Sequence, residues 1–128
     1  MALRKHRLAL GLAALAGSAA MLAVTAPAQA APAPGDPATW PCDPSEFCIY
    51  HDGQGGGAHY SLADGASDLG VLAGGLNDHV WSVKNISGSR WCLYKDADYE
   101  NEIQVILDGQ AIDLASPVRD QVSSVKEC

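Results

Sequence analysis

The apolar positions of residues 42–128 form short runs rather than long amphipathic stripes. Several runs alternate apolar and polar side chains or are rich in β-branched residues, and Gly, Asn and Asp clusters separate them. No apolar stripe with the helical period extends beyond about two turns. The pattern therefore predicts short strands of an all-β sandwich or barrel. The expected strands cover residues 47–50, 58–62, 69–72, 80–86, 91–94, 103–107, 111–114 and 122–126.

These runs also repeat along the chain. Residues 47–52 (Phe-Cys-Ile-Tyr-His-Asp) align with residues 91–96 (Trp-Cys-Leu-Tyr-Lys-Asp) at an offset of 44, and residues 82–85 align with 124–127 at an offset of 42. Two matching blocks in the same order predict two copies of a four-stranded unit, a first copy at about 46–86 and a second at about 90–128. Because a unit of about 40 residues cannot bury a sufficient core alone, we expect the copies to pack face to face.

The first 30 residues are typical of a bacterial secretion signal. Three basic residues precede an uncharged Ala- and Leu-rich run over residues 8–24, which ends at the small-x-small pattern of residues 28–30. A membrane anchor is the alternative, but the run is weakly apolar and a proline-rich stretch follows at once. We therefore predict a signal peptide (1–30), a disordered or extended proline-rich leader (31–41) and one β domain (42–128) of an extracellular protein with no membrane attachment after cleavage.

Removal of the signal peptide would make the chain strongly acidic. The sequence has 8 Lys and Arg against 15 Asp and Glu, and three of the basic residues lie in the signal. Five basic residues then remain, for a net charge of −10. Five scattered cations cannot form the basic patch that binds nucleic acid or anionic membranes. The acidic surface favours solubility, or the binding of cations or a basic partner.

All four cysteines follow the leader. An even number of cysteines in a short exported chain predicts two disulfides, and the three possible pairings are not separated by the sequence. A metal site is the alternative, but the chain has no Cys-x-x-Cys pair and its histidines are not spaced as zinc ligands. The cysteines are Cys42, Cys48, Cys92 and Cys128.

The repeated blocks resemble the Greek-key motif of the βγ-crystallins. In that motif an aromatic residue is followed by a second aromatic five positions later and by glycine two positions after that, and a serine occurs near the last strand. The second copy has Tyr94, Tyr99, Asn101 and Ser124 at these positions. Asn101 is a sensible replacement because asparagine tolerates the positive φ that the turn requires.

The first copy fits the same motif with one exception. Tyr50, Gly57 and Ser82 stand at the expected positions, but Gly55 replaces the second aromatic residue. The resemblance implies a βγ-crystallin-like sandwich of two four-stranded Greek-key motifs stabilised by disulfides. In each motif the serine hydroxyl would tie the folded first hairpin to the last strand.

Within that superfamily the chain is similar to the secreted bacterial proteins of peptidase inhibitor family 36. Those proteins have a signal peptide, an early cysteine pair and repeated Phe/Trp-Cys-Leu-Tyr-x-Asp segments. The resemblance implies an inhibitor of an extracellular peptidase, in particular a metalloproteinase, and a Cys42–Cys48 disulfide that leaves Cys92–Cys128 as the second. A bridge between Cys48 and Cys92 is the alternative. The loops at 53–57 and 96–102 are candidate contact segments because they should project from the fold.

A crystallin-like calcium-binding or purely structural extracellular domain is the alternative function. Crystallin-type calcium sites use the motif Asn/Asp-Asn/Asp-x-x-Ser/Thr-Ser and exchange oxygen ligands between copies. The first copy keeps the pair Asn77 and Asp78 but has Trp81 in place of a hydroxyl. The second copy keeps Asp120 and Ser123 but begins with a cation, Arg119.

A partial calcium site, with Asp78 from one copy and Ser123 from the other, is therefore a hypothesis. The alternative is that these residues only build the turn before the last strand. No cofactor is otherwise required, and we expect a monomer. Catalysis is not expected, because nothing in the sequence couples the carboxylates to a cleft.

Overall fold

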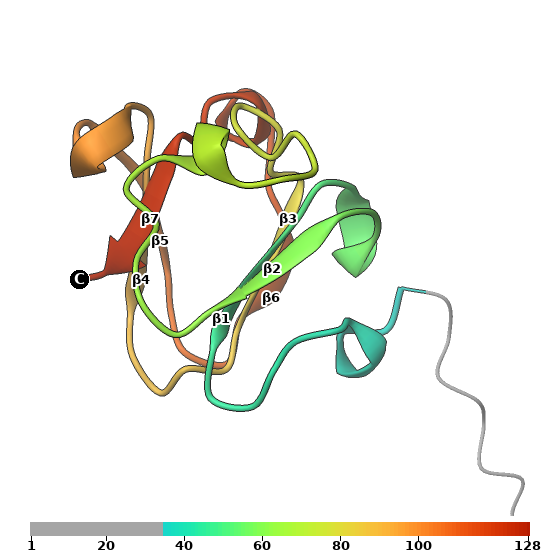
Figure 1. Ribbon diagram of the computed structural model, residues 1–128. Helices are drawn as coiled ribbons and strands as arrows, with labels where there is room; N and C mark the ends of the chain where they lie inside the picture. Colours follow the sequence, from blue (N-terminus) through green and yellow to red (C-terminus); the bar gives the residue numbers. More distant parts are fainter. Residues whose placement is uncertain (1–34) are drawn as a thin grey trace, which may run out of the picture.

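Two antiparallel β-sheets packed face to face make up the domain (Figure 1), which the computed structural model describes over residues 35–128. The predicted signal peptide and the first residues of the leader lie outside the described residues. One sheet has the strand order β2–β1–β3–β6 and the other β5–β4–β7. The strands are β1 (Phe47–Tyr50), β2 (His59–Leu62), β3 (Ser82–Asn85), β4 (Trp91–Tyr94), β5 (Glu102–Ile106), β6 (Ala111–Asp113) and β7 (Ser124–Glu127).

The two copies exchange their third strands. Strand β6 belongs to the second copy by sequence, but it pairs with β3 of the first. In return, Ala66 of the first copy forms a bridge with Val125 of β7. The exchange ties the two Greek keys together and confirms the sandwich predicted from the repeat.

The strand predicted at 69–72 is wrong. The segment forms a 3-10 turn, η3 (Leu69–Val71), and the Ala66 bridge is all that remains of a third strand in the first copy. The Asp68 carboxylate accepts a hydrogen bond from the Gly70 amide at 2.8 Å, which closes a local turn in competition with a strand ladder. Leu69 is buried, whereas Val71 faces solvent, so the apolar run does not line one face of a sheet.

Equivalent aromatic residues of the two copies meet at the centre of the core. The rings of Phe47 and Trp91 stack with centroids 4.5 Å apart and an interplanar angle of 6°. Ile49 of the first copy and Leu93 of the second, again equivalent positions, are fully buried in the same cluster. Each copy thus buries its inner face against the other, as its small size requires.

The folded hairpins have the geometry that the crystallin resemblance implies. In the first copy the Gly55 amide donates to Ser82 Oγ at 2.9 Å, and the hydroxyl donates to the carbonyl of Asp52 at 2.6 Å. In the second copy Tyr99 and Ser124 form the same contact at 3.1 Å. The turn residues Gly57 and Asn101 have φ values of 71° and 58°.

Both disulfides follow the pairing implied by the resemblance. Cys42 is joined to Cys48, and Cys92 to Cys128. The second bridge fastens the carboxyl end of the chain to β4, the middle strand of its sheet. Within residues 35–128 no helix is long and apolar enough to cross a membrane.

Candidate functional site

The proline-rich leader supplies the aromatic side chain that the first copy lacks. Trp40 is only 6% exposed, and its ring lies 5.6 Å from that of Tyr50 at an angle of 74°. In the second copy Tyr94 and Tyr99 form the same edge-to-face pair at 5.8 Å and 69°. A Cβ on Gly55 would lie 2.3 Å from Trp40 Cγ, so the glycine leaves the space that the indole fills.

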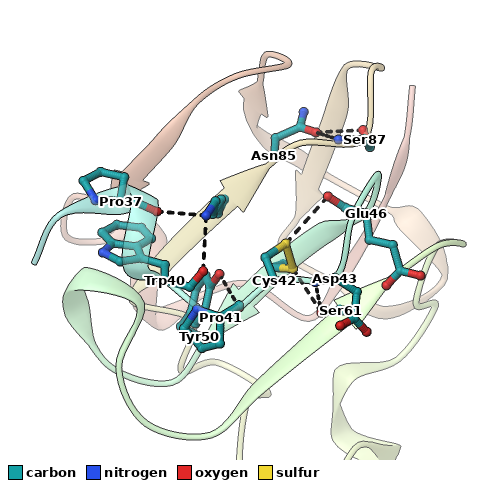
Figure 2. The surroundings of a disulfide bond; sticks show 12 residues. Pro37, Trp40, Pro41, Cys42, Asp43, Glu46, Tyr50, Ser61, Asn85 and Ser87 are labelled. Carbon is teal, nitrogen blue, oxygen red and sulfur yellow. Dashed lines mark hydrogen bonds between the residues drawn. A yellow bond between two sulfur atoms is a disulfide. The ribbon is translucent and has the colours of Figure 1, made fainter. Parts of the chain in front are cut away.

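Residues 35–41 of the leader are therefore part of the folded domain, which begins before the predicted boundary at residue 42. Lys84 Nζ donates to the carbonyls of Pro37 and Trp40 at 2.8 and 3.2 Å, and Tyr50 Oη donates to the carbonyl of Pro41 at 2.8 Å (Figure 2). The Cys42–Cys48 disulfide then joins the end of the leader to β1. Prolines lack the amide needed for a strand ladder, but their carbonyls still accept hydrogen bonds.

Burial raises the pKa of Tyr50 to about 12. The pKa of Tyr94 is also raised, mainly by burial and secondly by the negative charge of Glu102. An unfolded tyrosine ionises near pH 10. The stabilisation from neutral Tyr50 is thus complete below about pH 10 and is lost as the pH rises toward 12. We expect the melting temperature of Tyr50→Phe to fall less steeply than that of the wild type above about pH 10. An identical alkaline fall in both proteins, or an equal change in the control Tyr60→Phe, would contradict this assignment.

The structure brings Asp78 and Ser123 together across the two copies. Ser123 Oγ donates to Asp78 Oδ1 at 3.1 Å, and the Asp78 amide donates to the carbonyl of Val122 at 2.9 Å. Asn77 Nδ2 lies 3.3 Å from the second carboxylate oxygen of Asp78. Three of the predicted calcium residues therefore share one surface site with oxygen donors from both motifs.

The fourth predicted calcium residue, Asp120, belongs to a different arrangement. Arg119 Nε lies 3.8 Å from Asp120 Oδ2, and the guanidinium carbon lies 4.6 Å from the centroid of the Trp81 ring. A protein cation thus stands beside the Asp120 carboxylate, over the tryptophan that replaces a hydroxyl ligand. The pair formed by Asp120 and position 81, which corresponds to the pair formed by Asp78 and Ser123, is therefore unsuited to a metal ion.

The two loops predicted to project are tied back onto the sandwich. Loop 53–57 is held by the Gly55–Ser82 contact, and Gln54 N donates to Asp113 Oδ1 at 2.7 Å. Loop 96–102 is held by Ser124, and the Asp98 amide donates to the carbonyl of Ser67 at 2.7 Å.

A different segment, residues 63–76, presents an apolar side chain to solvent, and it is called the 63–76 loop below. Val71, the last residue of η3, is 78% exposed, whereas Leu69 and Leu76 on either side are fully buried. The Leu69 amide donates to the carbonyl of Ser123 at 2.9 Å, and Ala66 pairs with Val125. The loop is thus anchored at both ends and exposed in the middle. The apolar run predicts a strand, and the pattern therefore does not show that Val71 is exposed.

Solved structures with the same fold are βγ-crystallin domains. A βγ-crystallin from Ciona intestinalis has a TM-score of 0.55 and 23% identity, and the match covers 65% of this chain and 99% of that one. A βγ-crystallin domain from Clostridium beijerinckii has a TM-score of 0.54 and 25% identity, over 63% and 94%. The domain is therefore a βγ-crystallin-type double Greek key.

The particular family is shown by sequence. The model of peptidase inhibitor family I36 matches residues 35–106, more than half of the chain, and the chain belongs to this family. The match begins within the leader, in agreement with the structural role of Trp40. A comparison with curated proteins finds no match. Membership of an inhibitor family on a crystallin fold identifies a non-enzymatic protein whose partner is a peptidase.

Proposed function

We propose that the chain is a secreted inhibitor of metalloproteinases that contacts the enzyme through the 63–76 loop. The observation that carries the proposal is the match to peptidase inhibitor family I36 over residues 35–106, which include this loop. The metalloproteinase target rests on the resemblance to the secreted bacterial inhibitors. Two disulfides fit an extracellular location, where such an enzyme would be met.

The anchoring of the loop supports inhibition rather than cleavage. Its buried leucines and backbone hydrogen bonds fix its conformation before binding, so little ordering entropy is lost on association. Val71 offers an apolar side chain that can fill a pocket of the enzyme, and such buried anchors carry most of the energy of an interface. A loop held at both ends also resists the local unfolding that a peptidase needs in order to cleave a peptide bond.

The test is an inhibition assay with the purified, disulfide-bonded protein. We expect it to inhibit a thermolysin-like metalloproteinase with a 1:1 end point and to leave a subtilisin-like serine peptidase active. Inhibition of the serine peptidase alone would contradict the metalloproteinase target. Full activity of both enzymes at micromolar excess of the protein would contradict the proposed function as a whole.

Weak calcium binding is a second candidate function, favoured by the contact between Asp78 and Ser123. We expect calcium at about ten times its dissociation constant to stabilise the fold by about 1.4 kcal/mol. Thermal unfolding with millimolar calcium measures this, and Asp78→Asn should abolish the shift. Asp120→Asn is the matched control, because Asp120 already faces Arg119. No shift in the wild type, or an equal loss in both variants, would contradict calcium binding at this site.

A further inference from the structure

A cluster of two histidines and a carboxylate lies at one end of the first copy. His51 and Asp52 follow strand β1, and His79 comes shortly before β3. One candidate ligand atom from each of the three residues lies within 4.8 Å of the others. The two segments are held side by side because the Trp81 amide donates to the carbonyl of Tyr50 at 3.0 Å.

We propose that His51, Asp52 and His79 bind a divalent transition-metal ion of the Zn²⁺ type. Imidazole nitrogens combined with a carboxylate are the donors that Zn²⁺ and its neighbours prefer, whereas calcium takes oxygen ligands only. The site is therefore chemically distinct from the Asp78–Ser123 pair, although His79 follows Asp78 directly in sequence.

The backbone of the cluster is already fixed. The His51 amide donates to the carbonyl of Ala58 at 2.8 Å, and the His79 amide donates to the carbonyl of Leu76 at 3.1 Å. The carbonyl of Asp52 accepts the Ser82 hydroxyl at 2.6 Å. Metal binding would thus need side-chain adjustment but no change of the fold, which keeps its entropic cost small.

The side chains have both the freedom and the orientation that the ion requires. Zn–N bonds of about 2.0–2.1 Å place tetrahedral ligand atoms about 3.4 Å apart, and His51 and His79 are only half-buried, so rotation about χ1 and χ2 can close the gap. His51 Nδ1 lies 2.7 Å from Asp52 Oδ1. Coordination of one ion by both groups would replace this hydrogen bond, with His51 binding through Nδ1 and Asp52 through the facing carboxylate oxygen.

Ring stacking is the competing explanation of the cluster. The imidazole centroids of His51 and His79 lie 4.1 Å apart, and His79 stacks on Trp81 at 5.1 Å. Stacking alone does not require the carboxylate beside His51, whereas a metal site uses all three groups. The excess of acidic over basic residues in the chain further favours a cation at its surface.

The test is calorimetric titration of the purified protein with ZnCl₂ near neutral pH. We expect one Zn²⁺ per chain with a micromolar dissociation constant, and shifts of the His51 and His79 imidazole resonances by NMR. His51→Ala and His79→Ala should each weaken binding at least tenfold, and Asp52→Asn about tenfold. His59→Ala is the matched control, since His59 stacks on Tyr50 instead, and circular dichroism verifies that each variant is folded.

Three results would overturn the proposal. The first is no binding heat at millimolar Zn²⁺, and the second is a loss in His59→Ala as large as that in His79→Ala. The third is loss of Zn²⁺ binding in Asp78→Asn while His51→Ala keeps it, which would place the ion at the Asp78–Ser123 pair.

Discussion

Replacing Trp40 with alanine is expected to lower the free energy of unfolding by about 3–5 kcal/mol, the usual cost of truncating a buried tryptophan. The indole covers Gly55 and the edge of Tyr50, and its loss opens a cavity where the second copy has Tyr99. Urea denaturation of the wild type and the variant measures the difference. A change below about 1 kcal/mol, as for a surface residue, would contradict the structural role of the leader.

A double variant tests whether Trp40 truly stands in for the missing aromatic residue. Gly55→Tyr alone should be strongly destabilising, because a Cβ at this position collides with the indole. A Trp40→Gly background also removes the Trp40 Cβ, which lies 2.6 Å from a Cβ built at Gly55, so the tyrosine has room there. The positive φ of 69° is matched by the 62° that Tyr99 adopts in the second copy. We expect the double variant to be more stable than either single variant. Additive losses would show that the two positions do not share one site.

Replacing Val71 with aspartate is expected to weaken peptidase inhibition by about 30- to 1000-fold, equivalent to about 2–4 kcal/mol for an interface anchor. The variant would place a charge where the enzyme receives an apolar side chain. Val71 is 78% exposed in the free protein, so the folded state should be almost unaffected. Inhibition constants for one metalloproteinase measure the loss of binding, and melting temperatures measured alongside them show whether the fold has lost stability.

Leu107→Asp is the matched control for this prediction. Leu107 is also apolar and 54% exposed, but it directly follows β5, far from the 63–76 loop in the sequence. The control should inhibit as the wild type does. Equal inhibition by both variants would exclude Val71 as an anchor, and a greater loss in Leu107→Asp would move the contact surface to the β5–β6 turn.

The fold was largely predictable because its pattern occurs twice. The aromatic–Cys–aliphatic–Tyr blocks placed β1 and β4, and the two Ser-Val-Lys segments placed β3 and β7. Each copy also had to bury its inner face, so a face-to-face sandwich followed from size alone. The pairing of the cysteines came from the family resemblance, since three pairings fit the sequence equally well.

The features that were missed depend on contacts between distant segments. Prolines predicted a disordered or extended leader, whereas Gly55 was the clue that a side chain from elsewhere must fill its place. The sequence predicts a strand at 69–72, but the Asp68 carboxylate accepts a hydrogen bond from the Gly70 amide and closes a turn within the 63–76 loop. The His51–His79 pair is separated by 28 positions and carries no motif, and it is the antiparallel pairing of β1 with β3 that brings the two residues together.

The 63–76 loop is the surface proposed to bind the peptidase. Hydrogen–deuterium exchange of the protein, free and in complex with a thermolysin-like metalloproteinase, tests this most directly. We expect slower exchange in the complex for peptides that cover residues 69–76, with residues 107–110 unchanged. Inhibition accompanied by protection only outside the 63–76 loop would contradict it.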